Sequence, residues 1–128
     1  MAKPALDVGL VSGDAQPLVA FYAGVAGLEP LDPLALPNVG TIHRLACGQS
    51  LLRILVPVEA PARDPSPSFS ATAGIRYLTL EVEDVDAAVA AARALGGRVL
   101  LAPFELRPGR RVAQVADPDG NTVGLVQG

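Results

Sequence analysis

Polar and apolar side chains alternate between Arg76 and Val82, and this run holds the most suggestive chemistry in the sequence. Tyr77, Thr79 and Glu81 fall on one face of the predicted strand, and apolar residues fall on the other. A tyrosine hydroxyl can donate a hydrogen bond to a ligand, and a glutamate can accept one or take up a proton. The run therefore predicts a strand with one face in the core and one face free to bind.

The chain has one histidine, His43, and one cysteine, Cys47. One His excludes a two-His metal centre within the chain, and one Cys excludes an intrachain disulfide or a Cys-based zinc site. His43 lies in the predicted strand TIHRLA and is either a general base or unusual ligand, or a hydrogen-bonded histidine of the sheet. Cys47, at a turn, is expected to be an ordinary thiol. Any metal would need mostly oxygen ligands.

A weak internal repeat shows which elements must position these side chains. Residues 6–28 and 75–97 each read as an extended apolar piece, an Asp, an apolar helical stretch and a Gly. Aligning the two segments without a gap matches Asp14 with Asp84, Gly27 with Gly97, and Asp7 with Tyr77. The two Asp are expected to cap helices, and we expect Gly27 and the pair Gly96-Gly97 to end them.

Strand-like runs follow each predicted helix, at residues 40–46 and 50–56 in the first half and 98–102, 111–116 and 122–126 in the second. Three Pro and three Ser mark residues 58–73 as a linker. We expect one α+β domain, residues 1–128, made of two β-α-β-β-β modules at residues 5–57 and 74–128.

Composition excludes several classes of protein. The 128 residues are half hydrophobic and 18% charged, which favours a packed core over disorder. A net charge of -3 argues against nucleic acid or an anionic membrane as a partner. Because there is no signal-like segment and no apolar run of roughly 20 residues, we expect a soluble cytoplasmic protein.

Three segments in order resemble the vicinal oxygen chelate superfamily, which includes glyoxalase I, extradiol dioxygenases and bleomycin-resistance proteins. They are Phe21-Tyr22 with Gly27-Leu28, the helix within residues 83–97, and the turn DPDGN at residues 117–121. The resemblance covers nearly the whole chain and implies two βαβββ modules in a cup-shaped open barrel. It also implies a homodimer.

In that superfamily the metal ligands come from the first and last strands of each module. Carried over, these positions fall on Asp7, Arg53, Tyr77 and Gly124; a slip of one residue would replace Asp7 by Val8. Arg53 would repel a cation, Tyr77 is a poor ligand unless ionised, and Gly124 has no side chain. The resemblance therefore implies a site without its usual metal, and we expect no cofactor.

The cup of the resembled fold would gather several candidate ligand-binding residues. They are Asp7, Arg53, Tyr77, Thr79 and Glu81 on the concave face, with Phe104 and Arg111 at a rim. Arg53 could grip a carboxylate or phosphate, or could simply pair with Asp7. The rim segment that contains Phe104 and Arg111 also holds Glu105, Arg107 and Arg110, and its pattern favours a solvated hairpin over a binding rim. Phe21 and Tyr22 are expected in the core.

Three functions remain open on the sequence alone. The first is a metal-free protein of the bleomycin-resistance type that binds a small molecule. The second is an enzyme of the same fold, a lyase or isomerase, with Glu81, Tyr77 or His43 as acid or base, or a dioxygenase type with an atypical metal site. The third is a small structural or regulatory dimer without a ligand.

Overall fold

The computed structural model describes residues 4–63 and 70–128. Part of the predicted linker, residues 64–69, lies outside the described residues. The elements are β1 (Val8–Val11), α1 (Ala15–Ala26), β2 (Glu29–Leu36), β3 (Gly40–Cys47), β4 (Ser50–Pro57), β5 (Tyr77–Glu81), α2 (Val85–Ala94), β6 (Arg98–Arg107), β7 (Arg110–Ala116) and β8 (Thr122–Gln127). None of the described helices is long and apolar enough to cross a bilayer.

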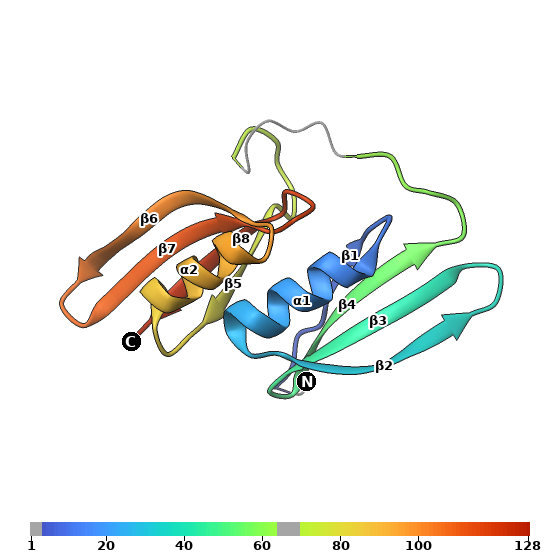
Figure 1. Cartoon of the computed structure of the whole chain (residues 1–128), viewed down its shortest axis with the longest axis horizontal. Helices are drawn as coiled ribbons and strands as arrows, with labels where there is room; N and C mark the ends of the chain where they lie inside the picture. Colours follow the sequence, from blue (N-terminus) through green and yellow to red (C-terminus); the bar gives the residue numbers. More distant parts are fainter. Residues whose placement is uncertain (1–3, 64–69) are drawn as a thin grey trace.

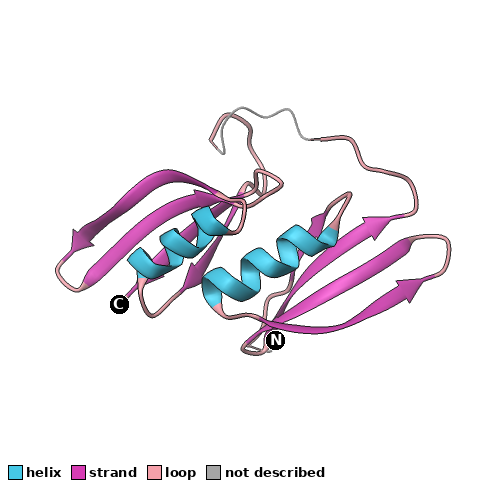
Figure 2. Cartoon of the chain, viewed as in Figure 1, coloured by secondary structure: helices cyan, strands magenta, loops and turns pink. Residues whose placement is uncertain are grey.

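Two four-stranded mixed sheets form, in the orders β1-β4-β3-β2 and β5-β8-β7-β6. In each, the strand before the helix pairs in parallel with the last strand, and the other pairs are antiparallel. Both helices lie on the same side of the sheets and run next to each other (Figures 1 and 2). The α+β class and the two βαβββ units are as predicted, and the sheets are not closed into a barrel.

Local chemistry explains where the helices begin and end. The Asp14 carboxylate accepts from the backbone N–H of Gln16, and the Asp84 carboxylate accepts from that of Ala87, so both are N-caps as predicted. Gly27 ends α1 in the left-handed conformation, with φ of 68°. Helix α2 ends at Ala94 with Leu95 as its C-cap, and Gly96, the first glycine of the predicted pair, follows with φ of 88°.

Strand β2 is the element that the sequence did not locate. It contains Pro30 and Pro33, which cannot donate to a sheet ladder, and all eight of its residues are exposed. It is an edge strand, and its pairing with β3 shifts register between Leu31 and Leu34. Tertiary pairing therefore overrides a poor local preference for strand.

Helix α1 joins the two halves through a side-chain contact with the second half. Tyr22 is fully buried, and its hydroxyl donates to Asp117 Oδ2 at 2.7 Å across 95 residues of sequence. Asp117 also accepts from the backbone N–H groups of Asp119 and Asn121 and from Asn121 Nδ2. The first Asp of DPDGN therefore organises the turn and anchors α1, and the predicted core role of Phe21 and Tyr22 is confirmed.

Burial governs the ionisation of this pair. It raises the pKa of Tyr22 far above its usual value, and the neighbouring Asp117 carboxylate adds to the effect. Burial also raises the pKa of Asp117, although its hydrogen bonds from Tyr22 and Asn121 oppose that shift. A neutral tyrosine is therefore strongly favoured here.

Candidate functional site

The helix-free faces of the two sheets carry most of the predicted binding residues. In β4, Leu52 and Ile54 are buried under α1, so Arg53 between them faces the other way. In β5, Tyr77, Thr79 and Glu81 alternate as exposed residues with Leu78 and Leu80, which pack on the core. We call these two surfaces the open faces of the first and second sheets.

On the open face of the first sheet, Asp7 and Arg53 form an ion pair. The Arg53 Nη2 atom lies 3.3 Å from Asp7 Oδ2, and Asp7 Oδ1 accepts from the backbone N–H of Leu51 at 2.8 Å. Both side chains are about half exposed, so the pair is weak and easily displaced. Val8 packs against the core, so Asp7 and not Val8 is the first-strand residue on this face.

The open face of the second sheet holds a pocket of about 170 Å³. Its lining includes Tyr77, Thr79, Leu101, Val112, Gln114, Gly124 and Val126. Thr79 is the register partner of Gly124, and a Cβ added to Gly124 would lie 3.0 Å from Thr79 Oγ1. Gly124 therefore shapes the floor of the pocket and leaves no room for a longer side chain unless Thr79 moves.

Phe104 pairs with Val112 and so lies on the same open face, whereas Arg111 does not. Arg111 faces α2, where Nε and Nη2 bind the two carboxylate oxygens of Asp86 at 2.7 and 2.9 Å. This hydrogen bond lowers the pKa of Asp86. Of the rest of the rim segment, Glu105 accepts from the backbone N–H of Gly109, and Arg110 donates to the carbonyl of Gly128. The structure thus separates Arg111 from the other predicted binding residues.

His43 is also on the helix side of its sheet. It is the register partner of Ile54, which is fully buried, and it lies two residues before the buried Leu45, on the same face of β3. The structure therefore does not bring His43 together with Tyr77 or Glu81 on an open face. Cys47, on the same side, is a free thiol packed against the core.

Two residues that the sequence analysis passed over belong to the open faces. Gln114 lines the pocket of the second sheet, and Arg44 lies directly opposite Arg53 in the first. Both faces of strand β7 carry polar and apolar residues, so its alternation does not reveal which residues face outward. Arg44 follows His43 directly and precedes the buried Leu45, so alternation along β3 puts it on the face opposite Leu45, and the register with β4 then places it beside Arg53.

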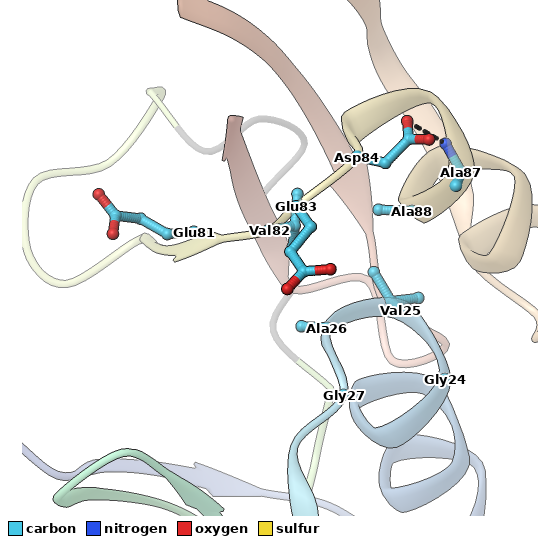
Figure 3. A pocket seen from close by; sticks show the side chains of 10 residues that line it. All are labelled: Gly24, Val25, Ala26, Gly27, Glu81, Val82, Glu83, Asp84, Ala87 and Ala88. Carbon is cyan, nitrogen blue, oxygen red and sulfur yellow. Dashed lines mark hydrogen bonds between the residues drawn. The ribbon is translucent and has the colours of Figure 1, made fainter. Parts of the chain in front are cut away.

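A larger pocket, about 600 Å³, lies between the C-terminal end of α1 and the β5–α2 connection (Figure 3). Glu83 points toward Ala26 and Gly27, whereas the Glu81 carboxylate points away from Glu83 (Figure 3). Asp84 is committed to capping α2. The pocket is on the side of the helices. Its lining includes Glu81 among the predicted binding residues, but none of the four carried metal-ligand positions.

Comparison with known proteins identifies the family. A model of the Glyoxalase/Bleomycin resistance protein/Dioxygenase superfamily matches residues 6–125. The chain belongs to this superfamily. None of the curated proteins matches it significantly.

Solved structures of this superfamily share its fold. The protein SMU.1112c is 29% identical, with a TM-score of 0.75, over 99% of this chain and 100% of that chain. A glyoxalase family protein from Bacillus cereus is 14% identical, with a TM-score of 0.80, over 99% and 95%. The trypanothione-dependent glyoxalase I of Leishmania major is 21% identical, with a TM-score of 0.75, over 98% and 87%.

The residues of this superfamily member do not fit a divalent metal at the positions where the resemblance places one. Asp7 is the one carboxylate among the four carried positions, and the Arg53 guanidinium occupies its side chain. Within residues 4–63 and 70–128, no group of three or more His, Cys, Asp or Glu side chains is placed to hold a metal ion. A cation at Asp7 would have to displace Arg53 and find other oxygen ligands.

Proposed function

We propose that this chain binds a small molecule on the open faces of its sheets and uses no divalent metal at the superfamily's usual site. The observation that carries the proposal is the Asp7–Arg53 ion pair, with 3.3 Å between Nη2 and Oδ2. An arginine fixed as a cation at a ligand position opposes metal binding and favours an organic ligand. Gly124, packed against Thr79, supplies no donor in the other sheet.

The pocket on the second sheet supports a ligand of mixed polarity. Leu101, Val112 and Val126 provide apolar walls, while Tyr77, Thr79 and Gln114 provide hydrogen-bonding groups. At about 170 Å³ it is smaller than the roughly 300 Å³ or more of usual small-molecule sites. We therefore propose that a second copy of the chain completes the site in a cytoplasmic homodimer.

An enzyme of the same fold is the second candidate, because Tyr77 lines the pocket and Glu81 extends from the same face of β5. Such an enzyme would use these residues for proton transfer in a lyase or isomerase reaction. The placement of His43 on the helix side weighs against it as a partner in that reaction.

Metal analysis of the purified, untagged protein tests the proposal. We expect less than about 0.1 equivalent of bound metal and no change in the melting temperature on adding Mn²⁺, Fe²⁺, Ni²⁺ or Zn²⁺. Arg53→Leu is the informative variant, because it frees Asp7 without adding a metal-ligating atom, and we expect its melting temperature also to be unchanged by these metals. A stoichiometric metal, or a shift of several degrees in the wild type, would overturn the metal-free proposal.

A further inference from the structure

The open face of the first sheet pairs two arginines directly across neighbouring strands. Arg44 on β3 and Arg53 on β4 are register partners, which places their side chains on the same face about 5 Å apart at the backbone. Like charges in this position repel each other. The repulsion is reduced because the guanidiniums turn toward opposite neighbouring strands, Arg44 toward Asp32 of β2 and Arg53 toward Asp7 before β1, and an anion bound between the two arginines would reduce it further.

The protein itself supplies little of that negative charge. Asp7 pairs with Arg53 through a single contact of 3.3 Å at a half-exposed site. Arg44 Nη2 donates to the backbone carbonyl of Asp32 at 2.8 Å, and no carboxylate among the described residues pairs with it. Glu29 is on the same face of β2, but it lies opposite Ala46 and is exposed.

The side chain of Arg44 also has an unsatisfied hydrogen-bond donor. Its Nε–H is buried and has no acceptor among the described residues. Buried guanidinium donors are normally satisfied, so the Nε–H of Arg44 is a donor that an added acceptor could satisfy after a small movement of the side chain. The Asp32 carbonyl that fixes Nη2 comes from the irregular part of β2, between Leu31 and Leu34.

The surroundings of the two arginines are apolar. Ile42 and Leu55 are register partners on the same open face, and the neighbouring Leu31 and Leu34 are 36% and 47% exposed. Low polarity around a guanidinium strengthens its interaction with an anion. The same apolar surface would contact the hydrocarbon part of a ligand.

We infer that Arg44 and Arg53 together bind the anionic group of the ligand, a carboxylate, sulfonate or phosphonate carried on an apolar body. This inference rests on the proposed small-molecule function and names its ligand class. Two guanidiniums present several N–H donors to one anion, and Asp7 would give up its weak contact as the anion enters.

Two fluorescent dyes with the same aromatic skeleton test this inference. 1-Anilinonaphthalene-8-sulfonate carries an anionic sulfonate, and N-phenyl-1-naphthylamine lacks it. We expect the wild type to bind both dyes and the anionic one more tightly. Arg44→Met and Arg53→Met should each weaken the anionic dye about tenfold and the neutral dye less than about twofold.

Arg93→Met is the matched control, because Arg93 lies in the last turn of α2 on the helix side of the sheets. It removes the same charge and should change neither affinity by more than about twofold. Thermal unfolding is measured for every variant, and Arg44→Gln replaces Arg44→Met if the latter does not fold. Glutamine keeps a donor for the Asp32 carbonyl but removes the charge.

The outcomes separate this inference from the function on which it rests. If both dyes bind and the arginine variants leave the ratio of the two affinities unchanged, the anion site is refuted while small-molecule binding stands. If Arg93→Met weakens the anionic dye as much as the other variants, overall charge and not this pair is responsible, and the inference also fails. If neither dye binds the wild type, the proposed binding function itself is overturned.

Discussion

The buried hydrogen bond from Tyr22 to Asp117 should hold the two halves of the molecule together, and Tyr22→Phe tests it. The substitution keeps the ring, which packs edge-on against Phe21 with centroids 5.1 Å apart, and removes only the hydroxyl. It leaves Asp117 Oδ2 with Asn121 Nδ2 as its remaining side-chain donor. Because a hydrogen bond to a charged group contributes about 1.5–3 kcal/mol, we expect a loss of that size in the free energy of unfolding at pH 7.

Urea and thermal unfolding measure this loss. For a domain of this size it corresponds to a fall of about 6–12 °C in melting temperature. Asp117→Asn and the double variant complete a mutant cycle, and we expect a coupling energy of at least about 1 kcal/mol. A loss below about 0.5 kcal/mol for Tyr22→Phe, with no coupling to Asp117, would refute the reasoning.

The pH dependence follows from the directions of the two pKa shifts. Asp117 has a raised pKa in the folded state, so the folded state binds more protons than the unfolded state and stability falls as pH rises through that range. The hydrogen bond from Tyr22 lowers this pKa, so removing the hydroxyl raises the pKa of Asp117 further. The difference in unfolding free energy between wild type and Tyr22→Phe should therefore be smaller at pH 4 than at pH 7.

At the alkaline end, the raised pKa of Tyr22 keeps the folded state neutral while the unfolded tyrosine ionises near pH 10. The wild type should therefore lose up to about 1.4 kcal/mol of stability per pH unit above pH 10. Tyr22→Phe should lack this component. Equal alkaline slopes for the two proteins would show that Tyr22 is not shielded from ionisation.

Glycine positions give two further predictions. Gly27→Val should cost at least about 1 kcal/mol and Gly27→Asn less, because φ is 68° there and asparagine tolerates the left-handed conformation better; equal melting temperatures would contradict this. Gly97→Ala should cost about 1–3 kcal/mol, because its Cβ would lie 2.6 Å from both the Ala116 carbonyl and Phe21 Cε2. Gly9→Ala, with nothing within 4 Å, is the matched control and should stay within about 0.5 kcal/mol in urea unfolding.

Local sequence was enough to determine the helices and most of the strands. A helix cap, a helix-ending glycine and an alternating strand each depend on neighbouring residues, so Asp14, Asp84 and the run from Tyr77 could be interpreted without tertiary information. The gapless repeat also matched Asp7 with Tyr77, and the registers of the parallel strand pairs β1–β4 and β5–β8 give these two residues equivalent positions. Asp7 and Tyr77 lie two positions diagonally from Arg53 and Gly124 respectively.

The candidate site was predicted less completely, because the face of a strand is decided by what packs on it. Strand β7 carries polar and apolar residues on both sides, so only the packing of α2 on it shows that Arg111 reaches Asp86 while Gln114 lines the pocket. His43 was a candidate acid or base as the single histidine of the sequence. It lies on the helix side of its sheet, and its neighbour Arg44 faces outward.

Local sequence patterns were sufficient to predict both helices and the strands other than β2, and they allowed the Asp7–Arg53 pair as one of two alternatives. The tertiary structure alone decided contacts between distant residues. Tyr22 and Asp117 are 95 residues apart, and Arg44 and Arg53 meet only because β3 and β4 pair in one register. A change of one residue in that register would turn Arg53 away from Arg44, because side chains alternate between the faces of a strand.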